Sequence, residues 1–215
     1  KLISPIYQEK LSLINNLVEN LQEQTEDINQ KNISGNWELI FSDVELFRSS
    51  PFFLAIEKAL NDKFKSDLFF KLHQLQVCSF GLSTVGKITQ NINFETKEFT
   101  SSFDTIIFGL TTIPIFGWFK ILPTFGGKVI TLANNLILKE NMLEMTLQKT
   151  KVTEVNGLKR IPIFDNILME RWYPVNEIWT KLPWNKDQPT CNLEIIYIDK
   201  DMRIVKDKYG SLFIY

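Results

Sequence analysis

The sequence contains very little histidine and cysteine. Its 215 residues include one histidine, His73, and two cysteines, Cys78 and Cys191. A zinc site needs three or four nitrogen or sulfur ligands, and a Ser-His-Asp or Cys-His centre needs a histidine beside its nucleophile. Two cysteines so far apart do not make a disulfide scaffold either. We therefore expect no metal site and no catalytic residues, and the protein is not expected to be an enzyme.

The sequence also lacks an excess of charge of either sign. Its formal net charge is −1, and the 24 basic residues include only four arginines. A nucleic-acid-binding domain normally carries clustered basic charge, so nucleic acid is not an expected partner. Aromatic residues are abundant instead, with seventeen Phe and five Trp. A chain of this length with 44% hydrophobic residues is expected to form one domain, residues 1–215, around a large core.

Two segments have the periodicity of helices. Residues 5–30 are predicted to form an amphipathic leading helix. Its apolar stripe consists of Ile6, Leu13, Ile14, Leu17, Val18 and Leu21. Residues 46–75 are predicted to be a helical insertion, in which Ser49 or Ser50 before Pro51 is typical of an N-cap followed by proline in the first turn.

Alternating apolar and polar residues predict strands in residues 36–42 and throughout 84–215. The clearest segments are 36–42, 85–94, 98–103, 129–139 and 142–149, with further strands expected around 151–155, 160–164 and 193–213. One leading helix with eight or nine antiparallel strands suits an up-and-down barrel, which can enclose one small ligand. The predicted fold is therefore mainly β, a lipocalin-like antiparallel β-barrel with an N-terminal amphipathic helix and an inserted helix.

The stretch 196–214 has the pattern of a β-hairpin. Residues 207–210 have the composition of a tight turn in which glycine takes a positive φ. Asp199 and Asp201 lie two residues apart, and Arg203 beside them would keep both carboxylates ionised, which does not suit a general acid. We expect a structural ion pair among these three residues. The alternative is that Arg203 faces inward and holds the carboxylate or carbonyl of a ligand.

A second notable segment is the uncharged run 106–119. It is too short and too interrupted by glycine and proline to span a bilayer as a helix. It is expected to be a loop packed over the barrel mouth, an aromatic tip in a membrane interface, or a surface for a protein partner. The candidate membrane or partner contacts are Phe108, Ile115, Phe116, Trp118 and Phe119.

Three segments resemble the PAP/fibrillin family, the plastid lipid-associated proteins. The terminal hairpin is similar to the signature Tyr-Leu-Asp-x-Asp-Leu-Arg-Ile, followed by a turn and Gly-x-Leu-Phe-Val. The matching residues are Tyr197, Asp199, Asp201, Arg203, Ile204, Gly210, Leu212 and Phe213. The strand from Gly35 through Trp37 and Leu39 is similar to the Gly-x-Trp-x-Leu-x-Tyr strand that opens the family's barrel, with Phe41 in place of tyrosine. Residues 86–90 are similar to its Gly-x-x-x-Gln strand.

The resemblance implies a lipid- or isoprenoid-associated protein of plastids, located at the thylakoid membrane or the plastoglobule surface. It implies binding or sequestration rather than turnover, with no required cofactor but with a lipid, carotenoid, quinone or chlorophyll as the possible ligand. A dry barrel interior would take such a molecule. The candidate lining residues are Trp37, Leu39, Phe41, Ile88, Ile92, Leu143, Met145, Leu147 and Arg203. A cleaved targeting peptide before Lys1 fits this location.

The alternative is a non-enzymatic accessory subunit with a plugged barrel. Its aromatic run 106–119 would dock it onto a thylakoid membrane complex, such as a photosystem with its antenna. The volume of the cavity distinguishes the two functions, because a barrel filled by its own rings carries no cargo. His73 lies among apolar residues of the helical insertion, where a structural role is expected and ligation of a chlorophyll magnesium is the alternative.

Overall fold

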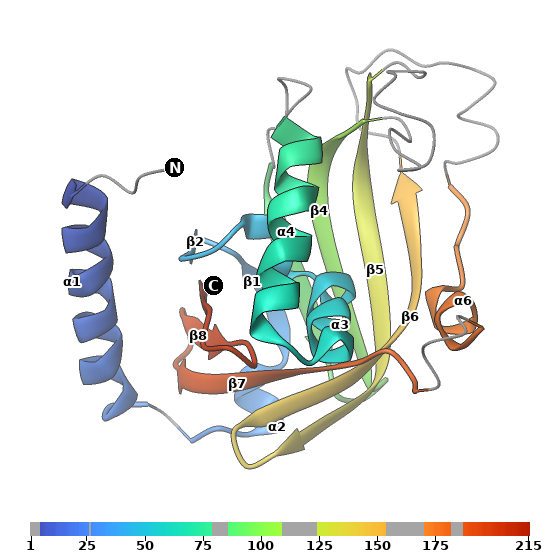
Figure 1. Cartoon of the computed structure of the whole chain (residues 1–215). Coiled ribbons are helices and arrows are strands. Elements are labelled where there is room, and N and C mark those ends of the chain that lie inside the picture. The colour runs from blue at the N-terminus through green and yellow to red at the C-terminus, as the bar shows by residue number, and fades with distance from the viewer. Residues whose placement is uncertain (1–4, 26, 79–85, 109–123, 154–169, 182–186) are drawn as a thin grey trace.

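The computed structural model describes residues 5–25, 27–78, 86–108, 124–153, 170–181 and 187–215 (Figure 1). Nine strands in these residues form one antiparallel, half-barrel sheet in the order β1-β3-β4-β5-β6-β7-β8-β9-β2. The strands are β1 Gly35–Glu38, β2 Phe41–Ser42, β3 Ile88–Asn93, β4 Glu98–Phe108, β5 Thr124–Lys139, β6 Met142–Thr153, β7 Thr190–Ile198, β8 Arg203–Lys206 and β9 Leu212–Ile214. The prediction of a mainly β, lipocalin-like fold is confirmed, with the barrel open.

The segment 35–42 connects the two ends of this strand order. β1 pairs antiparallel with β3, and β2 pairs antiparallel with β9. Between them, the Leu39 N–H donates to the Ile88 carbonyl at 2.9 Å, whereas the Ile40 N–H donates to the Ile214 carbonyl at 2.8 Å. The chain therefore changes hydrogen-bonding partner between these two residues, and the single strand predicted here is two short strands.

The helices differ from the predicted boundaries in instructive ways. They are α1 Pro5–Gln22, α2 Gln30–Ile33, the 3-10 helix η1 Leu46–Ser49, α3 Pro51–Leu60, α4 Lys63–Cys78 and α6 Val175–Thr180. The leading helix predicted over residues 5–30 is shorter, because α1 ends at Gln22. A separate short helix, α2, begins at Gln30, where the Asn29 side chain caps it by accepting the Asn32 N–H at 3.0 Å. The helical insertion is three helices, since Asn61 takes a left-handed conformation with a φ of 46° and ends α3.

The helices cover opposite faces of the sheet (Figure 1). On one face, Leu54 and Ala55 of α3 join the main buried cluster formed by β1 and β3–β9. On the other face, Val18 of α1 packs with Ile196 of β7 and Ile204 of β8 in a second cluster. α4 packs through Phe70 onto a third, aromatic cluster with η1 and α3. The chain is thus layered as α1, sheet, α3 and then α4.

The remaining strand predictions divide into three outcomes. The strand expected near residues 151–155 is the end of β6, which is continuous to Thr153. The terminal hairpin and its turn are confirmed, with Gly210 at a φ of 86° and the Asp207 carboxylate accepting the N–H groups of Tyr209 and Ser211. The strand expected at 160–164 lies outside the described residues.

Candidate functional site

Arg203 lies where segment 35–42 joins β3 to β9, a junction that we call the seam of the sheet. Its side chain is fully buried, at 0% exposure, although it begins β8 near the end of the barrel. The guanidinium carbon lies 4.4 Å from the centre of the Tyr215 ring and 5.2 Å from that of the Trp37 ring. Stacking on two aromatic faces stabilises a desolvated cation. The rings thus supply part of what water would supply to an exposed arginine.

Gln90 of β3 forms hydrogen bonds with both Arg203 and Tyr215. Its Oε1 accepts a hydrogen bond from Arg203 Nη2. Its Nε2 donates to the Tyr215 hydroxyl at 2.6 Å and to the Ser49 carbonyl at 3.2 Å. One amide therefore connects β3, β8, η1 and the residue that follows β9, and it fixes the orientation of Arg203.

Burial changes the acid–base properties of this cluster without producing a reactive group. Desolvation lowers the pKa of Arg203 to about 10, against the opposing effect of Tyr215. Desolvation also raises the pKa of Tyr215 to about 12, although Arg203 and the hydrogen bond from Gln90 oppose the rise. At neutral pH, Arg203 is therefore charged and Tyr215 is a neutral phenol, so the pair exchanges no proton under ordinary conditions.

The prediction of an ion pair among Asp199, Asp201 and Arg203 is wrong. The Asp199 carboxylate caps the turn between β7 and β8, where it accepts the N–H groups of Asp201 and Met202 at 2.7 and 2.6 Å and the Tyr197 hydroxyl at 2.7 Å. Burial alone would raise the pKa of Asp199, but these hydrogen bonds outweigh it and lower the pKa. Asp201 is exposed and lies 3.6 Å from Lys200. Alternation along one strand would place residues 199, 201 and 203 on the same face. The turn between β7 and β8 interrupts it, so both aspartates belong to the turn while Arg203 is buried as the first residue of β8.

Most of the predicted ligand-lining residues belong to one packed cluster. Trp37, Ile92, Leu143, Met145 and Leu147 contact the main core together with residues of α3, and Leu39 packs at its edge. Ile88 is also buried. Phe41 is the exception, because the chain changes partner before it and places its ring in the second cluster, beneath α1. The prediction that Phe41 shares a face with Trp37 and Leu39 is therefore wrong.

Most of the predicted membrane or partner contacts lie outside the described residues. Ile115, Phe116, Trp118 and Phe119 lie outside the described residues, and Phe108 is the last residue of β4. His73 and Cys78 belong to α4. Cys191 is a buried free cysteine, and desolvation raises the pKa of its thiol to about 12. Its thiol is accordingly a small apolar group of the core.

The three segments that resemble PAP/fibrillin proteins converge on one place. Trp37, Gln90 and Arg203 come from three different segments of sequence, and all three meet around the buried guanidinium. The PAP_fibrillin family model matches residues 6–215, essentially the whole chain. The chain belongs to the PAP_fibrillin family. No curated protein and no solved structure matches it.

Membership of PAP_fibrillin indicates a plastid lipid-associated protein from a family known as structural rather than catalytic. The described residues include no group of three or more His, Cys, Asp or Glu side chains placed to hold a metal ion. Within the same residues, no helix has the length and apolar character needed to cross a bilayer.

Arg48 is a second buried centre of this PAP_fibrillin domain, and sequence reasoning missed it. The residue is 5% exposed, and its guanidinium carbon lies 4.3 Å from the centre of the Phe70 ring of α4. Nη2 lies 3.1 Å from Glu57 Oε2 and 3.6 Å from Asp207 Oδ2. Nη1 lies 3.9 Å from Glu45 and 4.0 Å from Asp67. The partners come from four elements, and no spacing along the sequence indicates that they meet.

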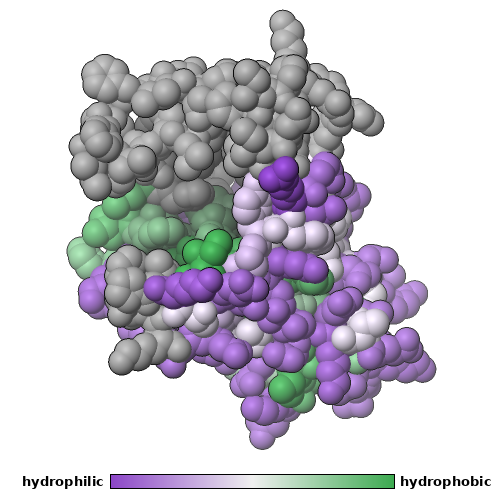
Figure 2. All heavy atoms as spheres, turned by 90° about the vertical axis from the view of Figure 1, so that its right-hand side faces the viewer, coloured by the Kyte–Doolittle hydropathy of each residue, from purple (hydrophilic) through white to green (hydrophobic). Residues whose placement is uncertain are grey.

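α4 presents an apolar stripe to solvent. Phe64, Leu68 and Leu72 recur every four residues on one face and are 76%, 48% and 52% exposed. The buried face of the helix carries Ser66 and Phe70, and Phe70 packs with Phe47 of η1 and Phe53 of α3. Figure 2 shows a mostly hydrophilic surface with a hydrophobic area toward the side that carries α3 and α4 in Figure 1. Exposed lysines accompany the stripe, namely Lys63, Lys65 and Lys71.

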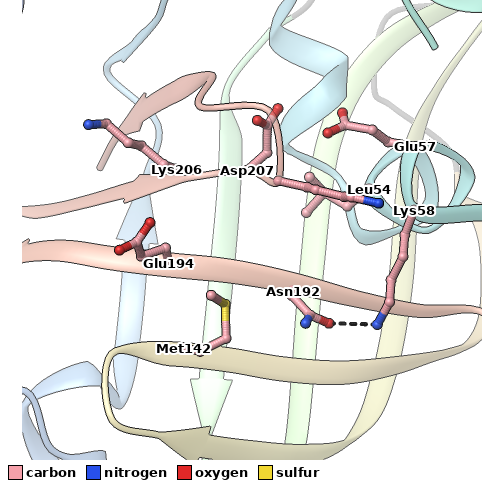
Figure 3. Close-up of a pocket in the computed structure, with 9 residues that line it drawn as sticks. Leu54, Glu57, Lys58, Met142, Asn192, Glu194, Lys206 and Asp207 are labelled. Atoms are coloured by element: carbon pink, nitrogen blue, oxygen red, sulfur yellow. Dashed lines mark hydrogen bonds between the residues drawn. The ribbon is translucent and has the colours of Figure 1, made fainter. Parts of the chain in front are cut away.

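A pocket opens where α3 meets β6–β8 and the β8–β9 turn (Figure 3). Its volume is about 350 Å³, and its wall includes Leu54, Glu57 and Lys58 of α3. Lys58 Nζ crosses it to donate to Asn192 Oδ1 of β7 at 2.9 Å. The remaining residues of the wall are Met142, Glu194, Lys206, Asp207 and Lys208.

Proposed function

We propose that this PAP_fibrillin protein attaches to a plastid lipid surface, at the thylakoid or the plastoglobule, through the exposed face of α4. The observation that carries the proposal is the stripe of Phe64, Leu68 and Leu72. Each of these side chains gains about 1.5–3 kcal/mol on leaving water, before ordering costs are subtracted. That gain is sufficient for reversible attachment by a helix lying in the membrane interface.

The charge around the stripe supports a lipid surface as the occupant. Lys63, Lys65 and Lys71 are exposed and adjoin the apolar face, whereas the one acidic residue of α4, Asp67, lies 4.0 Å from Arg48. Helices that lie in membrane interfaces combine an apolar face with lysines, which are attracted to anionic headgroups. The face therefore complements an anionic lipid surface in both polarity and charge.

The packing of the described interior favours attachment over enclosed cargo. Five of the residues predicted to line a ligand cavity are packed in one cluster that also holds Leu54 and Ala55 of α3. Interiors are close-packed, so a lipid chain would have to displace these side chains. Under this proposal the apolar ligand is the surface itself, and no turnover is involved.

Flotation with vesicles of phosphatidylcholine and phosphatidylglycerol tests the proposal. The variant Phe64→Gln, Leu68→Gln, Leu72→Gln is expected to stay in the bottom fraction, while the wild-type chain floats. Glutamine retains helix propensity and the three side chains are already largely exposed, so the melting temperature should change little. The matched control removes three scattered exposed side chains, in Ile40→Gln, Ile137→Gln, Ile178→Gln, and should float like the wild-type chain.

Three other outcomes would change the proposed function. If the α4 variant floats as well as the wild-type chain, the helix face is not the contact and the proposal fails. Docking onto a thylakoid membrane complex, with the run 106–119 as its proposed contact, predicts instead that the chain binds purified complexes in detergent and leaves protein-free vesicles unbound. Extraction of stoichiometric lipid, carotenoid, quinone or chlorophyll from the purified chain would favour cargo.

A further inference from the structure

The wall of the pocket contains two buried carboxyl groups that share one cation. Glu57 is 1% exposed and Asp207 is 5% exposed. Glu57 Oε2 and Asp207 Oδ2 both lie near the same nitrogen of Arg48, at 3.1 and 3.6 Å. Figure 3 shows Glu57 extending from α3 toward Asp207 in the β8–β9 turn. One guanidinium thus faces two carboxyl groups from elements far apart in sequence.

One oxygen of each carboxyl group is buried without a hydrogen-bond donor, which indicates that one of the two groups carries a proton. Glu57 Oε1 and Asp207 Oδ2 are buried and have no conventional hydrogen-bond donor. The other oxygen of Asp207 accepts the N–H groups of Tyr209 and Ser211, at 2.9 and 2.8 Å. An unpaired carboxylate oxygen is costly when buried. A proton on Glu57 removes the cost, because Glu57 then donates to Asp207.

Several other charged groups, from the surrounding helices, strands and turns, lie near Glu57 and Asp207. Burial and the nearby Asp207 raise the pKa of Glu57 to about 7, against Arg48. Burial also raises the pKa of Asp43, which follows β2 and accepts the Leu212 N–H. The remaining charged groups are Glu45 of η1, Asp67 of α4, Lys58 of α3, Glu194 of β7, Lys206 of β8 and Lys208 of the turn.

We propose that Glu57 is protonated and donates to Asp207, and that the two form a latch that fastens α3, and with it the wall of the pocket, to the β8–β9 turn. With Glu57 protonated, the buried pair has one negative charge opposite Arg48. Loss of the proton leaves two buried carboxylates against one guanidinium, and like charges so close repel each other. Two hydrogen bonds that contain no carboxylate, from Lys58 to Asn192 and from Lys208 to Asn61, then hold α3 and the α3–α4 turn to the sheet.

The sign of the pH effect follows from the direction of the shift. The pKa of Glu57 is raised in the closed form. When α3 is detached, the carboxyl group is exposed to water and its pKa returns to the ordinary value. Raising the pH through 7 therefore favours opening. With the pKa of Glu57 at about 7 in the closed form and at its ordinary value in the open form, the equilibrium constant for opening rises roughly tenfold between pH 6 and pH 8.

Hydrogen exchange measured by mass spectrometry, corrected for the intrinsic pH dependence of exchange, tests the latch on the full chain. The amides of α3 in the wild-type chain should lose roughly tenfold protection from pH 6 to pH 8. The variant Glu57→Gln keeps a donor for Asp207 and cannot ionise, so its protection should be high at both pH values. Glu194→Gln is the control, because Glu194 lines the same pocket away from Arg48 and should behave like the wild-type chain.

Each alternative outcome decides against the latch. Equal α3 protection in the wild-type chain at pH 6 and pH 8 would overturn it, as would a Glu57→Gln variant that loses protection as the wild-type chain does. If Glu57→Gln fails to fold, Asp207→Asn serves in its place. That variant retains an acceptor for Tyr209 and Ser211 and removes the charge that repels Glu57, so the pH dependence of α3 protection should be smaller than in the wild-type chain; an unchanged pH dependence would overturn the latch.

Discussion

Arg203 and Arg48 are both buried, and their surroundings differ. Arg203 forms no ion pair with any carboxylate in the described part of the chain and lies between two aromatic rings with one amide oxygen. Arg48 has four carboxylates within 4.0 Å and one ring beneath it. Arg203 joins strands across a seam of the sheet, whereas Arg48 joins helices to a turn. The strands around Arg203 are therefore held by an amide and aromatic rings, whereas the helices around Arg48 are held by carboxylates.

The difference has an energetic consequence. Removing one member of a buried ion pair leaves an uncompensated charge, but removing a cation from among neutral groups leaves only unpaired acceptors. The two arginines are equally hidden from water, yet they should respond differently to the same substitution. Their comparison can therefore separate the cost of burying a charge from the cost of losing a contact.

Arg48→Met should have the largest effect. It leaves Glu57 and Asp207 without their cation, and breaking a buried pair costs about 3–5 kcal/mol of unfolding free energy. The loss should be greater at pH 8 than at pH 6, since protonation of Glu57 relieves part of it. Urea unfolding at the two pH values measures both quantities, with the exposed Arg171→Met as control. A loss below about 1 kcal/mol would show that the carboxylates do not depend on Arg48.

Arg203→Met should cost less, about 1–3 kcal/mol, because it leaves a buried acceptor on Gln90 without its donor but strands no carboxylate. The loss should be equal at pH 6 and pH 8, since the pKa of Arg203 is about 10 and that of Tyr215 about 12. The same urea titrations test this. A loss that changes between the two pH values would reveal a titrating partner at the seam.

A double-mutant cycle sharpens the account of Arg203. Gln90→Leu removes the acceptor, so the double variant Arg203→Met, Gln90→Leu should be more stable than the sum of the two single losses indicates. We expect a coupling of about 1 kcal/mol, within the range for residues that share a hydrogen bond. Simple additivity would mean that the rings, and not the amide, account for the position of Arg203.

The smallest effects should come from the two aspartates first expected to pair with Arg203. Asp199→Ala removes a cap on two N–H groups and should cost about 1 kcal/mol. Asp201→Ala removes an exposed side chain near Lys200 and should change stability by less than about 0.5 kcal/mol. Thermal unfolding of both variants checks the order. An Asp201 effect as large as that of Asp199 would contradict the capping role.

Periodicity predicted most of the described strands, the start of the leading helix and the turn at Gly210, because each depends on local sequence. It also placed Trp37 inside, whereas an inward Arg203 was only the alternative to an ion pair. It failed at Phe41, where a change of hydrogen-bonding partner two residues earlier reverses the face of the strand. It failed for Asp199 because a capping carboxylate and an ion-paired one have the same sequence pattern. Arg48 depends on contacts among η1, α3, α4 and a distant turn, which no local pattern contains.

The change of partner within residues 35–42 also constrains the order of folding events. One half of that segment can pair soon after β3 forms, but the other half must wait for β9, and the Leu212 N–H bonds to an Asp43 carboxylate 169 positions earlier. Such distant pairings slow folding, because a long loop must close before they form. Until then β9 is an open strand edge, and open edges pair readily with other chains. The protein is therefore most exposed to mispairing with its own copies in the interval before the seam closes.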